Sequence, residues 1–294
     1  MTTKKILKLG FPKGSLQNAT IALFKRAGIR VTIPSSRSYY PISDDKDLEM
    51  MLIRSQEIAK YVQDGFFDVG LTGYDWICET NSNVQEVCEL NYAKSGFRFV
   101  KWVLAVPENS IIKSIEDLHG KRIATELVRY TTKYFAQRNI KVNVEFSWGA
   151  TEAKAGKFVD AIVELTETGS SLKENNLRII KEILQSSTRL IVNRSSLLDP
   201  WKKEKIENIS LLLQGALRAE NMVGLKLNVS NKNFTKIIQI LPSLKKPTVA
   251  KLHGDDWYAI EVILEETLVK EIIPILKRNG ATDIVEYSLN KIIY

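Results

Sequence analysis

Cysteine and histidine are scarce in this sequence, and their scarcity excludes several kinds of site. Cys78 and Cys88 are the only cysteines and form no CxxC pair. Because the start of the chain also shows no secretory hydrophobic segment, we expect a reducing cytoplasm. A Ser-His-Asp triad or a multi-histidine metal site would have to use His119 or His253, the only two histidines. Neither has a partner motif, so we expect a chemistry that needs little proton transfer by histidine.

Other signatures are missing as well. The chain has no GxxxxGK[ST] loop and no GxGxxG segment after a strand, which argues against a P-loop kinase and a Rossmann dehydrogenase. No hydrophobic run approaches the length of a membrane span. Zinc-finger and RNP-type aromatic motifs are absent too, so we expect no membrane and no nucleic acid as partner.

The net charge leaves one class of ligand open. The formal charge is +8, from 42 Lys and Arg against 34 Asp and Glu. Such a charge attracts either nucleic acid or a multiply phosphorylated small molecule. The basic residues are scattered along the chain rather than gathered in an arm. This distribution favours the small molecule, and nucleic-acid binding is an alternative that rests on charge alone.

Short hydrophobic strands alternate with helices through the first two thirds of the chain. Lys5–Gly10 has the alternation of a strand, a helix is predicted to end near Gly28, and Ser55 is predicted to cap a helix over Gln56–Gln63. This alternation favours α/β layers around a mostly parallel sheet, which bind ligands at the carboxyl ends of their strands. Asp199 is predicted to cap a long helix that begins at Pro200.

A weak internal echo favours two lobes of similar build. Gly65-Phe-Phe-Asp68 and Gly156-Lys-Phe-Val-Asp160 each place a helix-ending glycine and an aspartate before a strand, with the glycines 91 residues apart (156 minus 65). We expect one lobe over 1–98, a second over 99–187, and a return to the first lobe with a connecting helix over 188–222. From Val223 the order β-α-β-β-α-β predicts a separate module over 223–294.

The segment Val159–Leu172 has the pattern of a phosphate and ribose site. A strand over Asp160–Leu165 is followed by Thr166–Ser171, which supplies hydroxyls, backbone N–H groups and one glycine. The nearby carboxylates could accept ribose hydroxyls or share a magnesium ion; they are Asp160, Glu164 and Glu167. A polar turn after a core strand explains the same pattern equally well. Glycosyl transfer from a pyrophosphate-activated sugar suits such a site, because positioning and charge stabilisation carry most of its rate.

Three segments resemble the ATP phosphoribosyltransferase family in its long, regulated form. They are Gly10–Leu16, Asp68–Asp75 and Asp160–Leu172, and the resemblance spans the whole chain. It implies a two-lobed catalytic region like type II periplasmic binding proteins, followed by a C-terminal ferredoxin-like (βαββαβ) regulatory domain. It also implies transfer of a phosphoribosyl group from phosphoribosyl pyrophosphate to N1 of ATP, with Mg²⁺, as the first step of histidine biosynthesis.

The resemblance assigns roles to individual residues. Lys13 and Glu164 are the implied catalytic residues, and Asp160 and Glu164 compete for magnesium. The implied contacts of phosphoribosyl pyrophosphate are Asp160, Glu164, Glu167, Thr168, Gly169, Ser170 and Ser171. The implied contacts of ATP are Lys13, Gly14, Arg54, Tyr74, Asp75 and Glu152. Two departures stand out: Ser15 occupies a position where the family commonly has arginine, and the loop ends Gly-Ser-Ser rather than Gly-x-Thr.

For regulation, the resemblance implies that histidine binds the C-terminal module as feedback inhibitor. Asn228 and Thr248 are the expected histidine contacts, although the family often has an acid at the position of Asn228. A homo-hexamer built from dimers is also implied. The alternative from another class is a two-lobed small-molecule binding or sensor protein, which would hold its ligand in a similar cleft without turnover.

Overall fold

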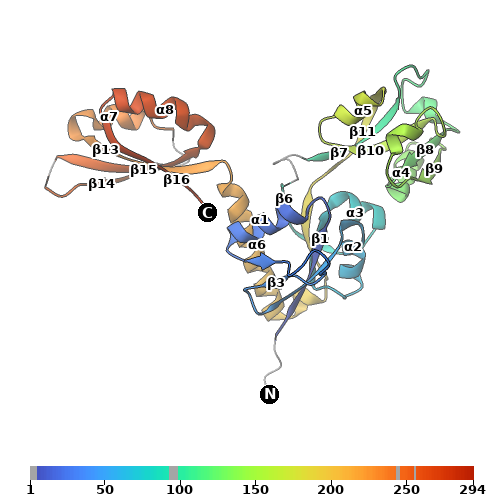
Figure 1. Ribbon diagram of the computed structural model, residues 1–294, viewed down its shortest axis with the longest axis horizontal. Helices are drawn as coiled ribbons and strands as arrows, with labels where there is room; N and C mark the ends of the chain where they lie inside the picture. The colour runs from blue at the N-terminus through green and yellow to red at the C-terminus, as the bar shows by residue number, and fades with distance from the viewer. Residues whose placement is uncertain (1–4, 93–98, 243–245, 255) are drawn as a thin grey trace. The chain divides into compact units, whose positions relative to one another are not determined.

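The computed structural model describes residues 5–92, 99–242, 246–254 and 256–294. The chain divides into two compact units (Figure 1). Unit 1 consists of Met1–Lys25 and Ile29–Ser210, and unit 2 consists of Arg26–Gly28 and Leu211–Tyr294. Residues 93–98, at the expected border between the two lobes, lie outside the described residues. Each unit is described by itself below.

The first sheet of unit 1 has the strand order β4-β1-β5-β12-β6. Its strands are β1 (Leu7–Lys13), β4 (Leu48–Arg54), β5 (Val69–Gly73), β6 (Gln85–Leu90) and β12 (Thr188–Val192). Its helices are α1 (Gln17–Ala27), α2 (Ser55–Gln63) and α3 (Tyr74–Thr80), and β2 (Val31–Thr32) pairs with β3 (Ile42–Ser43). β1 runs parallel to β4 and β5, whereas β12 runs antiparallel to β5 and β6.

The second sheet of unit 1 has the order β11-β7-β10-β8-β9. Its strands are β7 (Val100–Pro107), β8 (Arg122–Thr125), β9 (Asn143–Phe146), β10 (Ala161–Thr166) and β11 (Leu177–Ser186), with helices α4 (Val128–Ala136) and α5 (Ser170–Glu174). Short 3₁₀ turns are η1 (Glu116–Leu118), η2 (Thr151–Lys154) and η3 (Ser196–Leu198). β10 runs parallel to β8 but antiparallel to β7, which also pairs antiparallel with β11.

The α/β architecture is confirmed, but both sheets are mixed rather than mostly parallel. β11 ends at Ser186 and β12 begins at Thr188, so the chain passes between the sheets in nearly extended form. β12 then enters the first sheet antiparallel to both of its neighbours, β5 and β6.

Of the two predicted helix N-caps, Asp199 is confirmed and Ser55 is not. The Asp199 Oδ1 atom accepts hydrogen bonds from the N–H groups of Trp201 and Lys202, at 2.9 and 3.3 Å, at the start of α6 (Pro200–Ala219). Ser55, in contrast, is the first residue of α2 and not its cap, because the helix begins one residue earlier than the pattern indicates. The Ser55 carbonyl instead accepts the Thr72 hydroxyl at 2.6 Å.

The internal echo corresponds to a repeated local structure. Asp68 precedes β5, and its Oδ2 atom accepts the Lys8 N–H at 2.9 Å, while its own N–H donates to the Lys8 carbonyl at 2.9 Å. Asp160 precedes β10 and makes the same pair of bonds with Arg122, at 2.9 and 3.0 Å. Both glycines of the echo have positive φ, +79° and +75°. Each aspartate therefore fastens the amino ends of two neighbouring parallel strands.

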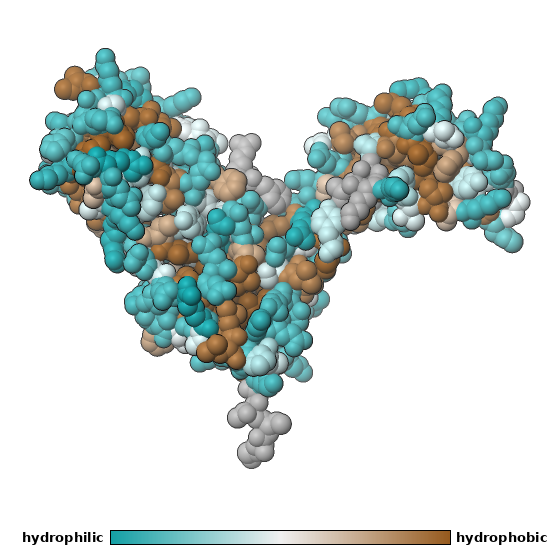
Figure 2. All heavy atoms as spheres, turned by 180° about the vertical axis from the view of Figure 1, so that it is seen from behind, coloured by the Kyte–Doolittle hydropathy of each residue, from teal (hydrophilic) through white to brown (hydrophobic). Residues whose placement is uncertain are grey.

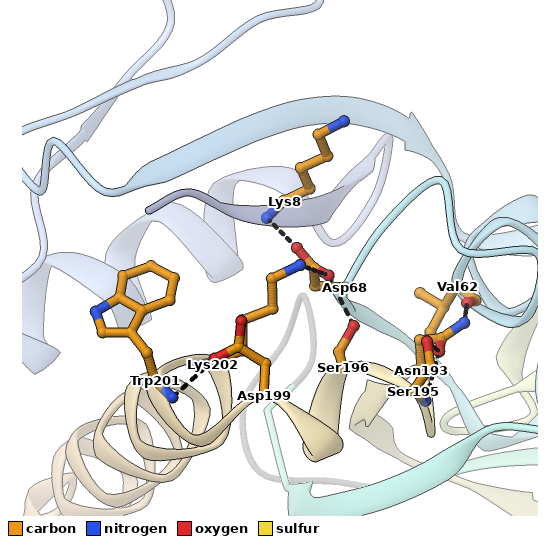
Figure 3. A network of polar contacts seen from close by, with 9 residues as sticks. All are labelled: Lys8, Val62, Asp68, Asn193, Ser195, Ser196, Asp199, Trp201 and Lys202. Carbon is orange, nitrogen blue, oxygen red and sulfur yellow. Dashed lines mark hydrogen bonds and ion pairs between the residues drawn. The ribbon is translucent and has the colours of Figure 1, made fainter. Parts of the chain in front are cut away.

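Asp68 has further partners that fasten the returning chain to the first sheet (Figure 3). Its Oδ1 atom accepts hydrogen bonds from the Ser196 hydroxyl at 2.7 Å and the Lys202 ammonium at 2.6 Å. Nearby, the Asn193 side-chain amide donates to the Val62 carbonyl at 2.7 Å. The carboxylate is buried, which alone would raise its pKa, but these donors outweigh burial and lower the pKa.

Unit 2 contains a four-stranded antiparallel sheet with helices on one face (Figure 1). Its elements are β13 (Met222–Ser230), α7 (Asn231–Ile240), β14 (Thr248–Lys251), β15 (Trp257–Glu265), α8 (Glu266–Arg278) and β16 (Ala281–Ser288). The strand order β14-β15-β13-β16 confirms the ferredoxin-like module. Its core packs Leu225 and Ile260 against Ile237 and Leu276 of the helices.

Unit 2 contains more than the ferredoxin-like module, whose first strand begins at Met222. The division falls inside α6, between Ser210 and Leu211, rather than at residue 223. The last turns of α6 are linked to the residues that end α1, because Arg26 forms an ion pair with Glu220 and its guanidinium also donates to the Ala216 carbonyl. The C-terminal unit therefore includes a helical stem as well as the sheet.

The surface is mainly hydrophilic with scattered hydrophobic patches. Figure 2 shows hydrophobic side chains among hydrophilic ones over both units. Among the exposed hydrophobic residues are Ile111, Leu198 and Phe158. Within the part of the chain that the structure describes, no helix combines the length and hydrophobicity needed to cross a membrane.

Candidate active site

Unit 1 contains a cleft of about 340 Å³ that residues of both sheets line. The first lobe contributes Lys13 from the end of β1 and Arg54 from the end of β4. The second lobe contributes Glu164 from β10 and Trp102 from β7. Lys13, Arg54 and Glu164 lie toward the carboxyl ends of their strands, as expected for ligand sites of α/β sheets, whereas Trp102 lies near the amino end of β7, which runs antiparallel to β10.

Two cations form the first lobe's side of the cleft. Lys13 and Arg54 are paired in register as the last residues of β1 and β4. The Lys13 ammonium lies 3.9 Å from the centroid of the Tyr39 ring, a cation–π contact. Gly14 does not line the cleft but has φ of +109°, which lets the chain turn directly after Lys13. Neither cation forms an ion pair within the described residues, so both remain available to an anion.

Glu164 is the acid of the second lobe's side. It is half-buried, and this burial raises the pKa of its carboxyl group, with Glu152 and Glu126 raising it further. The Thr151 hydroxyl and the Leu165 N–H, which lies 3.1 Å from Oε1, act in the opposite direction. A carboxylate in this setting is stabilised by any positive charge that enters the cleft.

The predicted phosphate loop is a tight turn at the start of α5. Gly169 has φ of +79°, and its N–H donates to the Thr166 hydroxyl at 2.7 Å. The hydroxyls of Thr168 and Ser170 lie 3.0 Å apart, and the Ser171 hydroxyl donates to the Glu152 carboxylate. Glu167 lines the cleft directly before these residues. The loop therefore gathers hydroxyl groups around one glycine immediately after the cleft-lining strand.

Asp160 is not brought to the cleft. It lies at the amino end of β10, four residues before Glu164, which corresponds to about 13 Å along a strand. Its carboxylate accepts the Arg122 N–H and lies 3.6 Å from the Lys121 ammonium. Sequence proximity suggested that Asp160 and Glu164 share a magnesium ion or the sugar, but a strand of this length separates them. Asp160 instead repeats the structural role of Asp68.

The arrangement of acids bears on how magnesium could be held. Among the described residues, no group of three or more His, Cys, Asp or Glu side chains is placed to bind a metal ion. Mg²⁺ commonly uses one or two carboxylates together with substrate phosphates. The cleft acids therefore fit an ion that arrives with a pyrophosphate rather than one held by protein ligands alone.

Of the other predicted ATP contacts, Asp75 lines the cleft but Tyr74 and Glu152 do not. The Tyr74 ring lies under the Arg189 guanidinium, 5.3 Å from its centroid, and contact with Cys78 raises the pKa of the Tyr74 hydroxyl. Asp75 is only 3% exposed. Glu152 is engaged by the phosphate loop through Ser171.

Sequence reasoning missed Glu126. This residue follows β8 directly and lines the cleft. Burial raises the pKa of its carboxyl group, the Asp75 charge adds to this, and a hydrogen bond with Gln56 opposes it. The signal was its position immediately after the hydrophobic residues of β8, at the edge where such sheets bind ligands.

In unit 2, Asn228 and Thr248 lie on the sheet face opposite α7 and α8. Asn228 pairs with Ala259 across β13 and β15, and Thr248 pairs with Glu261 across β14 and β15. The two strands are separated by β15, a distance of about 10 Å for two strand spacings. The Asn228 amide donates to the Asp283 carboxylate at 3.0 Å.

Comparison with protein families gives two matches that together cover most of the chain. Residues 54–215 match the family described as ATP phosphoribosyltransferase. Residues 219–291 match the family described as HisG, C-terminal domain. The first match covers more than half of the chain and includes the cleft-lining strand β10 and the loop after it.

Similar proteins span the full length. An ATP phosphoribosyltransferase of Thermodesulfovibrio yellowstonii is 56% identical over 98% of this chain and 99% of its own. The ATP phosphoribosyltransferase of Chlorobium luteolum is 56% identical over 99% of both chains. Among solved structures, a chain of the ATP phosphoribosyl transferase (HisG:HisZ) complex from Thermotoga maritima is 27% identical. It aligns with a TM-score of 0.60 over 71% of this chain and 98% of its own.

Proposed function

The chain belongs to the ATP phosphoribosyltransferase family, and from this premise we propose which parts of the cleft hold the two substrates. The enzyme transfers the phosphoribosyl group of 5-phosphoribosyl 1-pyrophosphate to N1 of ATP and releases pyrophosphate, the first step of histidine biosynthesis. Its relatives are named as transferases over their full length, so a binding or sensor protein without turnover is not retained.

We propose that the phosphoribosyl donor binds along β10 and the loop after it. Residues 167–171 receive the 5-phosphate, because this loop combines a left-handed glycine with several hydroxyls. Glu164 then lies three residues before the start of this loop, on the side of the ribose. The observation that carries this placement is that Glu164 and Glu167 line the same cleft as Lys13 and Arg54.

We assign the pyrophosphate and the triphosphate of ATP to Lys13 and Arg54. Both cations lack an ion-pair partner in the described residues, and a polyphosphate supplies several negative charges. Gly14 allows the backbone to turn beside the phosphates. Because Ser15, which also lines the cleft, is neutral, Arg54 and Lys13 carry the positive charge on this side.

The reaction needs little acid–base catalysis. The N1 lone pair of ATP forms a bond to C1 of the ribose while the bond from C1 to the pyrophosphate oxygen breaks, and its electron pair leaves with pyrophosphate. Positive charge develops at C1, where the Glu164 carboxylate stabilises it. Glu126 adds a second negative charge in the cleft. Magnesium bound with the donor would neutralise charge on the departing pyrophosphate.

Phosphate-loop variants test this placement. Gly169→Asp introduces a negative charge and a strained φ where the 5-phosphate is proposed to bind, so the affinity for phosphoribosyl pyrophosphate should fall by at least tenfold, or about 1.4 kcal/mol. Titration calorimetry measures it. Gly120→Asp is the matched control, because Gly120 also has positive φ, +77°, with open space around it, but lies at the amino end of β8. Equal loss of affinity in both variants would contradict the assignment.

We further propose that unit 2 binds histidine as a feedback inhibitor. The match to the family's C-terminal domain and the ferredoxin-like sheet support a regulatory module. Asn228 and Thr248 share one open face of this sheet, so a ligand with both an α-amino acid group and a ring could bridge them across β15. A homo-hexamer assembled from dimers, in the cytoplasm, completes the proposal.

A further inference from the structure

Helix α3 belongs to the first lobe by sequence but contacts the second lobe at both ends. Trp76 packs against the core of the second lobe, and its ring meets the Trp102 ring edge-on with 6.2 Å between centroids. At the other end, the Glu79 carboxylate accepts the backbone N–H groups of Arg129 and Tyr130, at 2.9 and 2.8 Å. These groups belong to the first turn of α4, where no intrahelical acceptor exists. α3 therefore braces one lobe against the other.

Asp75 occupies the centre of this brace. Its Oδ2 atom accepts the Trp102 indole N–H at 2.8 Å, and its Oδ1 atom accepts the Trp76 backbone N–H at 3.0 Å. Its own N–H donates to the Ser186 hydroxyl at 3.0 Å, where the chain leaves the second lobe. No cation pairs with this carboxylate among the described residues, so these donors are what stabilise its burial. Both oxygens are already engaged by the protein.

Trp102 connects the brace to the cleft. It lies on β7, pairs in register with Leu165 of β10, and is 2% exposed. Trp102 lines the cleft together with Leu165, its partner in register on the same face of the sheet, whereas the Glu164 side chain, which also lines the cleft, belongs to the other face. A rotation of the indole would therefore change the cleft beside Leu165.

We propose that Asp75 is a positioning residue that acts through Trp102, holding the indole at the cleft and the two lobes at the spacing that the substrates require. This inference rests on the proposed function, in which the same cleft holds both substrates. It replaces the expectation that Asp75 touches ATP directly, because a residue 3% exposed with both oxygens bonded offers a ligand little access.

A double-mutant cycle separates positioning from direct contact. Asp75→Ala and Trp102→Phe each remove one partner of the same hydrogen bond, so each should raise the KM for ATP and for phosphoribosyl pyrophosphate by about tenfold. The KM values of the double variant should not exceed those of the single variant with the higher KM, because either substitution alone already removes the shared hydrogen bond. Asp75→Asn should recover most of the affinity, since its side-chain oxygen can still accept the indole N–H.

Direct contact gives a different result. If Asp75→Ala raises the KM for ATP alone while Trp102→Phe leaves it unchanged, or if the two effects multiply in the double variant, the proposal is overturned. Trp201→Phe controls for the loss of a tryptophan outside the cleft. Should Asp75→Ala fail to fold by circular dichroism, Asp75→Asn alone decides, because it keeps the acceptor of the indole N–H: KM values near those of wild type are expected, and a KM for ATP raised tenfold or more would overturn the proposal.

The same variants, together with Gly169→Asp, distinguish failure of the positioning role from failure of the proposed function. If both single variants alter tryptophan fluorescence but neither changes either KM, the positioning role is overturned; Gly169→Asp then decides whether the cleft still holds the substrates. Unchanged donor affinity in Gly169→Asp would place the substrates elsewhere. Weakened donor affinity would leave the proposed function intact without a role for Asp75.

Discussion

Two aspartates with the same local geometry differ in how much they hold together. Asp68 and Asp160 each fasten the amino ends of two parallel strands. Asp68 is buried and also binds Ser196 and Lys202, whereas Asp160 is partly exposed and faces Lys121. Because the two side chains are chemically identical, their surroundings determine how much each contributes to the stability of the fold.

Replacing Asp68 should therefore be costly. Asp68→Asn leaves the Lys202 ammonium without its carboxylate and should lower the free energy of unfolding by about 2–3 kcal/mol at pH 7, as for hydrogen bonds to charged groups. Urea denaturation followed by circular dichroism measures it. Asp160→Asn is the control and should cost less than about 1 kcal/mol, because exposed ion pairs contribute little.

The Asp68 contribution should also depend on pH in a defined direction. Its pKa is lowered in the folded state, so its stabilisation is complete above the ordinary aspartate pKa of about 3.9 and is lost as the pH falls through the folded value. The difference between wild type and Asp68→Asn should shrink in that acidic range. A difference that stays constant down to pH 2 would rule out the carboxylate as its source.

Glu164 has the opposite shift, with consequences for activity. Burial, Glu152 and Glu126 raise its pKa above the ordinary 4.5, so kcat/KM should fall with decreasing pH through a value above 4.5 as the carboxylate is protonated. Glu126→Gln removes one negative neighbour and should move this acidic limb to lower pH. A pH–rate profile measures the shift; a limb that moves upward would show that Glu164 does not control it.

At the scale of elements, the strands and helices with local signals were predictable. Hydrophobic patterns predicted β10 and the βαββαβ module, and Asp199-Pro200 predicted the start of α6, each within a few residues of the observed bounds. The antiparallel entry of β12 was not predictable, because the pairing of a strand depends on partners far away in the sequence. The same limit affected the site. Glu164 and Glu167 of the predicted segment line the cleft, whereas the distance of Asp160 from the cleft follows from its place before β10, which the sequence pattern alone does not fix.

Helix α4 has a cap that only the folded structure reveals. Its N-cap residue, Leu127, provides no side-chain hydrogen bond, and Glu79 of α3 supplies the acceptor instead. Glu79→Ala should lower the free energy of unfolding by about 1 kcal/mol, the typical value of a lost cap. Chemical denaturation measures the change. Glu79→Gln retains an acceptor and should lose less; an equal loss in both variants would assign the effect to charge rather than to capping.

At the scale of the whole molecule, the two units permit a test of regulation. Histidine that binds folded unit 2 should stabilise it by about 2.7 kcal/mol at a concentration 100 times its Kd. Differential scanning calorimetry should show the transition of unit 2 moving to higher temperature. Asn228→Ala should reduce the shift, whereas Lys270→Ala on α8, across the sheet, should not. A shift that survives in Asn228→Ala would place the inhibitor at other residues.

The interleaved first sheet also determines the order in which the nascent chain can fold. β12 lies between β5 and β6, although it is synthesised after every strand of the second sheet. On the ribosome, the second lobe is complete once residue 186 has emerged, while the first still lacks an internal strand. The lobe that begins the polypeptide is therefore the later of the two to close its sheet, and until then β5 and β6 remain without their common neighbour.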